Sequence, residues 1–288
     1  MTAVSISKVG VLGAGQMGNG IAQVCATYGF DVVLSDISQA ALTGALKTIE
    51  NSCDRLIKKG AMNEDQKKGI LSRIHCTTKM EDFGTSDIVI EAATENVQLK
   101  LELFKKLDSL CKAEAILASN TSSISITKIA AATLRPEKVV GMHFMNPVPL
   151  MKLVEGIKGL QTSEQTFLTI RQLAEKMDKT LVESTKDMPG FIVNRILMPM
   201  INEAVYTLHE GIASVESIDQ AMKLGTNQPM GPLTLADFIG LDTCLAIMKV
   251  MYEGLADSKY RPCPLLVKYV EAGWLGRKTG RGFYRYNN

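Results

Sequence analysis

The chain has 288 residues, of which 46% are hydrophobic and 22% are charged, and its formal net charge is +2. This mixture is that of a globular protein and excludes a largely disordered chain. The near balance of charges argues against a general nucleic-acid binder, and no apolar run approaches the roughly 18 residues that span a bilayer. The length favours two domains.

The cysteines are scattered and form no CxxC pair, so the sequence predicts neither a disulfide framework nor a metal site. They are Cys25, Cys53, Cys76, Cys111, Cys244 and Cys263. We therefore expect a reducing compartment. The first residues lack a charged start and a long apolar stretch, which favours the cytoplasm, or the mitochondrial matrix if a transit segment has been removed.

Short β-branched runs alternate with longer amphipathic stretches as far as about Lys186. This alternation predicts an α/β fold with a doubly wound, mainly parallel sheet. The predicted strands are residues 8–12, 31–35, 88–92, 116–119, 139–143 and 180–183. Between the second and third strands, apolar residues recur at helical spacing from Leu42 to Ile57, Gly60 follows as a stop, and another helix begins at Glu64.

After Pro189-Gly190 the pattern becomes helical, so we expect two domains, residues 1–187 and an all-α C-terminal domain of residues 188–288. Pro189 is expected in the first turn of a helix. The predicted helices of this part are residues 191–209, 217–224 and 233–253. The glycine-rich tail of residues 273–284 is expected to be irregular.

A glycine motif follows the first predicted strand and opens a helix. Its residues, Gly13-Ala14-Gly15-Gln16-Met17-Gly18, fit the turn that admits a dinucleotide pyrophosphate in a Rossmann-like domain. Asp36 ends the next strand, where its carboxylate would bind the adenosine ribose and repel a 2′-phosphate, so NAD is favoured over NADP. Alternatively, the glycines form a mere tight turn and Asp36 caps the following helix.

Polar residues also follow the next two strands, where ligands bind in open α/β sheets. We expect Glu95 and Lys100 beside the nicotinamide half of the cofactor, and Asn120 in the same site. The alternative for Glu95 and Lys100 is an ordinary solvated pair at a helix start. His143 stands where a strand of β-branched residues ends, and it is either functional or an inert core histidine.

Several ordered motifs together resemble the 3-hydroxyacyl-CoA dehydrogenase family, and most closely its short-chain 3-hydroxybutyryl-CoA branch. The resemblance runs nearly end to end. Its motifs are Gly13–Gly18 with Asp36, Ser119–Ser123, His143-Phe144-Met145-Asn146-Pro147, Met151-Lys152-Leu153-Val154-Glu155, Pro189-Gly190-Phe191-Ile192-Val193-Asn194-Arg195, Met230-Gly231-Pro232 and Gly276-Arg277-Lys278-Thr279-Gly280.

The resemblance implies a catalytic pair, His143 and Glu155. Imidazole suits removal of the alcohol proton near neutral pH, and the carboxylate would stabilise the imidazolium that forms. Glu155 could instead be a surface acid that ends a strand.

Ser122 and Asn194 would bind the 3-oxygen and thioester region of the substrate, and Asn146 would support the histidine loop. Because Asn194 comes from the helical part, we expect the active site in the cleft between the domains. Ser122 could instead cap the helix of residues 124–132, and Asn194 could face solvent in mid-helix.

The family's coenzyme A arm corresponds to the helical excursion, with Arg55 and Lys59 as binding residues and Lys58 adjacent. Short-chain relatives often have Lys at the first position, and Arg55 keeps the charge but changes its geometry. A solvated basic helix end is the alternative.

We expect reversible, NAD-dependent oxidation of L-3-hydroxyacyl-CoA by a homodimer that binds neither nucleic acid nor membrane. The rivals are a dehydrogenase of a free hydroxy acid, of the gulonate type, and a non-catalytic, crystallin-like protein on the same scaffold. Arg55 and Lys59 argue against the first rival. The presence of all four residues Ser122, His143, Glu155 and Asn194 argues against the second.

Overall fold

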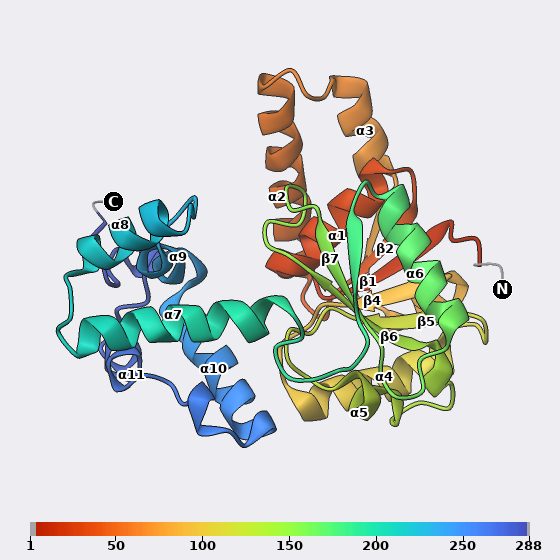
Figure 1. The fold of residues 1–288 in the computed structure, drawn as a ribbon. Coiled ribbons are helices and arrows are strands. Elements are labelled where there is room, and N and C mark those ends of the chain that lie inside the picture. Colours follow the sequence, from red (N-terminus) through yellow and green to blue (C-terminus); the bar gives the residue numbers. More distant parts are fainter. Residues whose placement is uncertain (1–3, 287–288) are drawn as a thin grey trace. The chain divides into compact units, whose positions relative to one another are not determined.

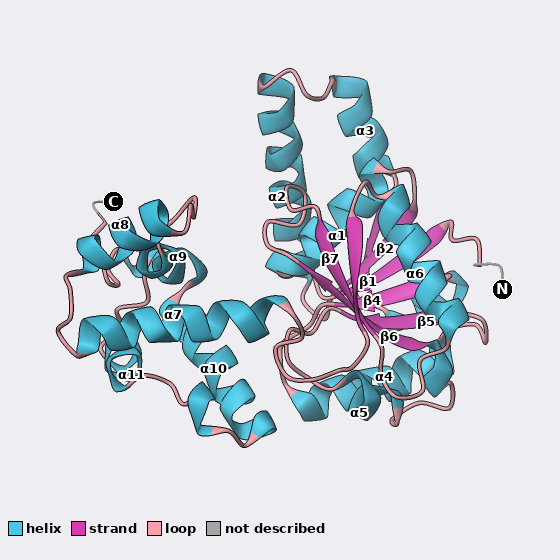
Figure 2. Ribbon diagram, in the orientation of Figure 1, coloured by secondary structure: helices cyan, strands magenta, loops and turns pink. Residues whose placement is uncertain are grey.

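The computed structural model describes residues 4–286, and the chain divides into two compact units, Met1–Asp187 and Met188–Asn288 (Figure 1). The first unit contains one sheet with helices on both faces (Figure 2). Its strands are β1 (Lys8–Leu12), β2 (Asp31–Ser35), β3 (Ile74–Thr77), β4 (Ile88–Glu91), β5 (Ile116–Ser119), β6 (Val139–Phe144), β7 (Leu153–Ile157) and β8 (Thr180–Ser184).

The order of strands across the sheet is β3-β2-β1-β4-β5-β6-β7-β8, and β3 to β6 are parallel. The chain therefore reverses its direction of winding between β1 and β4, where open α/β sheets bind ligands. β7 is antiparallel to β6, and β8 is parallel to β7. The predicted fold class, a Rossmann-like sheet followed by an all-α part, is confirmed.

The sheet is hydrophobic along most of its length because helices cover both faces. The helices of this unit are α1 (Gln16–Thr27), α2 (Gln39–Lys58), α3 (Glu64–Ser72), α4 (Val97–Leu110), α5 (Ile126–Ala130) and α6 (Glu164–Lys176). Two short 3₁₀ helices, η1 (Met80–Thr85) and η2 (Pro136–Lys138), complete it. Residues of α1, α2 and α6 share one apolar core with the central strands.

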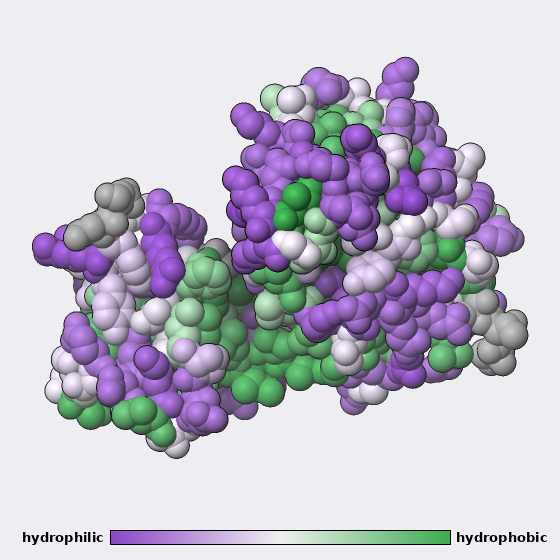
Figure 3. All heavy atoms as spheres, turned by 90° about the horizontal axis from the view of Figure 1, so that it is seen from above, coloured by the Kyte–Doolittle hydropathy of each residue, from purple (hydrophilic) through white to green (hydrophobic). Residues whose placement is uncertain are grey.

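The helices α2 and α3 form an arm that projects beyond the sheet (Figure 1). Ser38 caps α2, Asn63 and Gln66 form a capping box on α3, and Gly60, at φ +69°, turns the chain between the helices. Lys67 of α3 pairs with Asp54 of α2 at 2.6 Å, which holds the two helices together. Hydrophilic residues cover most of the first unit seen from the side of the arm (Figure 3).

The second unit is helical (Figure 2). Its helices are α7 (Val193–His209), α8 (Val215–Gly225), α9 (Pro232–Ile239), α10 (Leu241–Leu255) and α11 (Pro264–Glu271), with the 3₁₀ turns η3 (Ser258–Tyr260) and η4 (Arg277–Thr279). The prediction for Pro189 is wrong, because Gly190 and Phe191 have φ of +83° and +47° and α7 begins only at Val193. The single helix expected over residues 233–253 is two helices, since Gly240, at φ +104°, breaks it.

The glycine-rich tail is irregular, as expected, apart from η4 and isolated bridges, and it surrounds the carboxylate of Asp237. The oxygens of Asp237 accept hydrogen bonds from the amides of Phe283 and Tyr284, at 2.9 Å each, and from the Tyr286 hydroxyl. Burial raises the pKa of the Asp237 carboxyl, although these amides act in the opposite direction. A Cβ on Gly282 would lie 1.9 Å from Asp237 Oδ1, so only glycine fits there.

Candidate active site

The glycine loop links β1 to α1 and offers the open surface that a dinucleotide needs. Gly13 has φ +103°, and a Cβ on Gly18 would lie 1.8 Å from the Gly13 carbonyl oxygen, so these two glycines serve the turn and the helix packing. By contrast, nothing lies within 4 Å of a Cβ built on Gly15. The first turn of α1 has neither a side-chain cap nor an acidic residue, so it suits an anionic phosphate. Gln16 is exposed and Met17 half-buried in this turn.

Asp36 lies directly beside this loop. Its Oδ2 accepts a hydrogen bond from the Ala14 amide at 2.8 Å, and its Oδ1 accepts one from the Ser38 amide at 2.9 Å. The alternative role as a helix cap is wrong, because Ser38 caps α2. Each carboxylate oxygen has a second lone pair, so Asp36 can also accept hydrogen bonds from ribose hydroxyls.

His143 and Glu155 face each other on the antiparallel strands β6 and β7, where they are direct register partners. Side chains of directly opposed residues point to the same face of a sheet, which brings His143 Nδ1 to 2.6 Å from Glu155 Oε2. Both residues are buried, and Glu155 is fully so. The alternative that Glu155 is a surface acid at a strand end is therefore wrong. With Nδ1–H donating to the carboxylate, Nε2 is the basic nitrogen.

The loop after β5 carries the polar run expected near the substrate. Asn120 Oδ1 accepts a hydrogen bond from the Phe144 amide at 2.9 Å, which ties this loop to the residue after His143. Ser122 is half-buried, and its hydroxyl donates to Glu95 Oε1 at 3.1 Å. The alternative role of Ser122 as a helix cap is wrong, because Ser125 caps α5.

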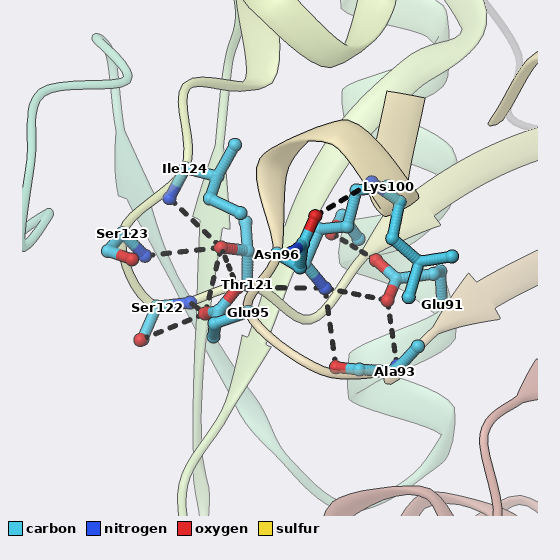
Figure 4. Close-up of polar contacts among 11 residues, drawn as sticks. Glu91, Ala93, Glu95, Asn96, Lys100, Thr121, Ser122, Ser123 and Ile124 are labelled. Atoms are coloured by element: carbon cyan, nitrogen blue, oxygen red, sulfur yellow. Dashed lines mark hydrogen bonds and ion pairs between the residues drawn. The ribbon is translucent and has the colours of Figure 1, made fainter. Parts of the chain in front are cut away.

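Glu95 and Lys100 meet in the same polar network (Figure 4). Lys100 Nζ lies 2.6 Å from Glu91 Oε1 and 3.6 Å from Glu95 Oε2. Lys100 is only 1% exposed, so the alternative of a solvated residue is wrong for Lys100, whereas the side chain of Glu95 is 41% exposed. Glu91, the fully buried partner of Lys100, is not among the residues predicted from the sequence, although a carboxylate at the end of the apolar run of β4 was a possible signal.

Two family models account for nearly the whole chain. One, described as the NAD binding domain of 3-hydroxyacyl-CoA dehydrogenase, matches residues 8–188. The other, described as the C-terminal domain of the same enzyme, matches residues 190–286. The chain belongs to the 3-hydroxyacyl-CoA dehydrogenase family. As the sequence predicts, it is an NAD-dependent oxidoreductase, and its cofactor is NAD.

Three relatives match this chain along nearly their full lengths. The 3-hydroxybutyryl-CoA dehydrogenase of Bradyrhizobium diazoefficiens is 60% identical over 99% of this chain and 97% of its own. The solved structure of (S)-3-hydroxybutyryl-CoA dehydrogenase from Ralstonia eutropha is 55% identical, covers 99% of this chain and 100% of its own, and has a TM-score of 0.95. That of FadB2 from M. tuberculosis is 41% identical over 99% and 100% of the two chains, with a TM-score of 0.96.

The residues that the 3-hydroxyacyl-CoA dehydrogenase resemblance assigns to coenzyme A lie at the end of α2. Arg55 and Lys59 are both exposed, and the Lys59 amide donates to the Arg55 carbonyl at 3.2 Å, so the two residues are one helical turn apart. None of the ion pairs found within residues 4–286 involves either side chain. Their role in binding stays a prediction.

Two asparagines complete the predicted site. Asn146 Oδ1 accepts a hydrogen bond from Gln16 Nε2 at 3.3 Å, which joins the loop after His143 to the first turn of α1. Asn194 belongs to the second unit, in the first turn of α7, and is buried. Its alternative as a solvent-facing residue is wrong, and its contact with substrate stays a prediction.

Lys179, which was also not predicted from the sequence, supports the loop between β6 and β7. Lys179 is 7% exposed, and its Nζ donates to the carbonyls of Val148 and Met151 at 2.8 and 2.7 Å. Burial lowers the pKa of this ammonium. Only the fold shows the role of Lys179, because its partners are backbone atoms about thirty residues earlier.

Proposed function

We propose that this enzyme interconverts short-chain L-3-hydroxyacyl-CoA, chiefly 3-hydroxybutyryl-CoA, and the matching 3-ketoacyl-CoA, with His143 and Glu155 as its acid–base pair. The observation that carries the proposal is the buried contact of 2.6 Å between His143 Nδ1 and Glu155 Oε2. A histidine held in this way is oriented and has one basic nitrogen, as general base catalysis requires.

In the oxidative direction, His143 Nε2 takes the proton of the 3-hydroxyl group. When bound, NAD supplies the acceptor for the hydride that leaves C3. The carboxylate of Glu155 stabilises the imidazolium, and the same proton returns to the ketone oxygen in the reductive direction. Ser122 and Asn194 bind the oxygen and thioester region, and Asn146 supports the histidine loop.

The cofactor residues have distinct roles in this proposal. The backbone at Gly13, Gly15 and Gly18, with Gln16 and Met17, holds the pyrophosphate at the first turn of α1. Asp36 binds the adenosine ribose. Glu95, Lys100 and Asn120 order the strand-end loops beside the nicotinamide half.

The short acyl chain is supported by the names of the relatives, since four of them, at 51% to 60% identity, are named 3-hydroxybutyryl-CoA dehydrogenases, two with the qualifier probable. Initial rates with acetoacetyl-CoA and with longer 3-ketoacyl-CoAs, each with NADH and with NADPH, test chain length and cofactor together. We expect the highest kcat/KM for acetoacetyl-CoA with NADH. A preference for a free hydroxy acid, or no turnover at all, would contradict the proposal.

We also propose a homodimer formed through the second unit. Most apolar residues of α7 pack inside that unit, and a groove of about 450 Å³ lies between α7 and α8. Its apolar lining includes Met200, Ala204, Ile218 and Met222. Analytical ultracentrifugation should give twice the chain mass of 31.4 kDa at micromolar concentration. A monomer under these conditions would contradict this part.

None of the helices in residues 4–286 combines the length and the apolar character that a bilayer-spanning helix requires. The six cysteines are unpaired, and five of them are buried. These thiols support our proposal of a reducing compartment such as the cytoplasm. Fractionation of the source cells, followed by detection of the protein, tests this assignment, and recovery from an oxidising compartment would contradict it.

A further inference from the structure

Glu91 and Lys100 form an ion pair that is almost wholly removed from water. Glu91 is 0% exposed and Lys100 is 1% exposed. Besides Lys100 Nζ at 2.6 Å, Glu91 accepts hydrogen bonds from the Ala93 amide at 2.7 Å and the Ser119 hydroxyl at 2.7 Å. Both oxygens of this carboxylate thus have a hydrogen-bond partner. Glu91 is the last residue of β4, and its register partner Ser119 is the last residue of β5.

The same ammonium reaches a second carboxylate that binds the substrate loop. Lys100 Nζ lies 3.6 Å from Glu95 Oε2. Glu95 in turn accepts hydrogen bonds from the Ser122 amide at 2.6 Å, the Ser122 hydroxyl at 3.1 Å and the Thr121 hydroxyl at 2.9 Å. One lysine therefore links the buried Glu91 to the carboxylate that holds Ser122 (Figure 4).

A buried ion pair contributes little to stability as such, since the desolvation of both charges opposes their attraction. The pair instead fixes the position of the Lys100 ammonium, which can then orient the carboxylate of Glu95. The side chain of Glu95 is 41% exposed, so solvent competes for its carboxylate. A lysine fixed by Glu91 attracts that carboxylate inward, toward the loop after β5. Glu91 also holds Ser119, the residue at which this loop begins.

We propose that Glu91 is a positioning residue for the dehydrogenase reaction, acting through Lys100 and Glu95 to fix the place and hydrogen-bond direction of Ser122. The inference rests on the proposed function, in which Ser122 binds the oxygen at C3. Glu91 itself touches neither substrate nor cofactor in this scheme. Loss of Glu91 should lower the rate because even a small displacement of Ser122 misaligns the reacting atoms.

A double-mutant cycle on turnover separates positioning from a structural role. Glu91→Gln should lower kcat for acetoacetyl-CoA reduction roughly tenfold, with less than about a threefold change in KM. In a Ser122→Ala background the same substitution should change kcat by less than about twofold, since the residue it positions has gone. Additive effects in the two backgrounds, or an unchanged kcat in either single variant, would overturn the proposal.

Asp108→Asn is the matched control. Asp108 lies in the same helix, α4, near its other end, and pairs with Arg135 at 2.6 Å. Its removal should lower the melting temperature and leave kcat unchanged. A loss of kcat in the Glu91 variant, but not in the Asp108 variant, would therefore not be explained by loss of stability alone.

If Glu91→Gln does not fold, the double substitution Glu91→Met with Lys100→Met replaces the pair by apolar side chains, which proteins often tolerate. It should fold, lose kcat to a similar degree and show the same non-additivity with Ser122→Ala. Full activity in this variant would overturn the proposal. An active parent with an additive cycle refutes the role of Glu91 alone, whereas a parent inactive toward acetoacetyl-CoA refutes the proposed function and this inference with it.

Discussion

The carboxylate oxygens of Asp36 accept hydrogen bonds from the amides of Ala14 and Ser38. A 2′-phosphate at this position would meet a like charge, so Asp36→Ser should raise the use of NADPH relative to NADH by about tenfold or more. The ratio of kcat/KM values for the two cofactors measures the effect. Asp31→Ser is the control, because Asp31 is an exposed residue at the other end of β2. An unchanged ratio in a folded Asp36 variant would place the ribose site elsewhere.

Asp87 directly precedes β4, at the amino ends of the parallel strands, and it makes the stability of the fold depend on pH. Although partial burial acts to raise it, hydrogen bonds from Lys112 and from the amides of Lys8 and Ser7 hold the pKa of Asp87 at about 2, below its ordinary 3.8. A lowered pKa means that the unfolded state binds more protons between these values. The stabilisation is therefore complete above pH 3.8 and is lost as the pH falls through about 2.

Asp87→Asn removes this titration. Its free energy of unfolding should be lower than that of the parent at pH 6, and the two should converge as the pH falls from 4 to 2. Urea unfolding at a series of pH values measures both. Parallel curves for parent and variant would show that Asp87 does not carry this pH dependence.

Single residues also show where sequence reasoning stops. The family resemblance was enough to predict that His143 and Glu155 form a pair. It was not possible to predict that they are register partners on adjacent strands, because the strand containing Glu155 was not among the predicted strands. Glu91 and Lys179 were not predicted as functional residues, because their roles depend on partners that only the fold brings together.

At the scale of elements, the six predicted strands are present with bounds shifted by at most one residue. Five of them are almost wholly buried, whereas β8, at the edge of the sheet, has mainly exposed and half-buried residues. The two strands that were not predicted each contain residues that weaken the apolar pattern of a strand. β3 has an exposed His75 and lies at the edge of the sheet, and β7 contains a charged Glu155 and Gly156 within five residues. The sites near these strands were correspondingly harder to derive.

The arm formed by α2 and α3 belongs to the same scale. Exposed Arg55 and Lys59, one turn apart, can converge on the phosphates of coenzyme A. Arg55→Ala or Lys59→Ala alone should raise KM for acetoacetyl-CoA by roughly tenfold to a hundredfold, since each charge-assisted bond contributes about 1.5–3 kcal/mol, and the double substitution should raise it further. The salt dependence of KM should also flatten.

The substrate itself supplies the control for the arm. An N-acetylcysteamine thioester lacks the phosphates, so parent and double variant should use it alike. Lys47→Ala removes another exposed lysine of α2, two turns earlier, and should leave both substrates unaffected. Equal losses with both substrates in the double variant would assign Arg55 and Lys59 to the fold and favour the free-hydroxy-acid rival.

At the scale of the whole molecule, alternating patterns followed by helical ones were enough to predict the fold class, because layer architecture follows from such patterns. We propose that Asn194, which belongs to the second unit, binds the substrate. Asn194→Ala should therefore lower kcat/KM for acetoacetyl-CoA roughly tenfold while the Kd of NADH is kept. Unchanged kinetics would confine the site to the first unit.

The central claim is that a His143 and Glu155 pair performs proton transfer in 3-hydroxyacyl-CoA oxidation. The most direct measurement is kcat for NADH-dependent reduction of acetoacetyl-CoA by His143→Asn and Glu155→Gln, with the Kd of NADH determined by fluorescence on the same samples. Both variants should lose roughly a hundredfold or more in kcat, the usual contribution of general acid–base catalysis, and bind NADH almost as the parent does. Turnover equal to that of the parent in either variant would contradict the account.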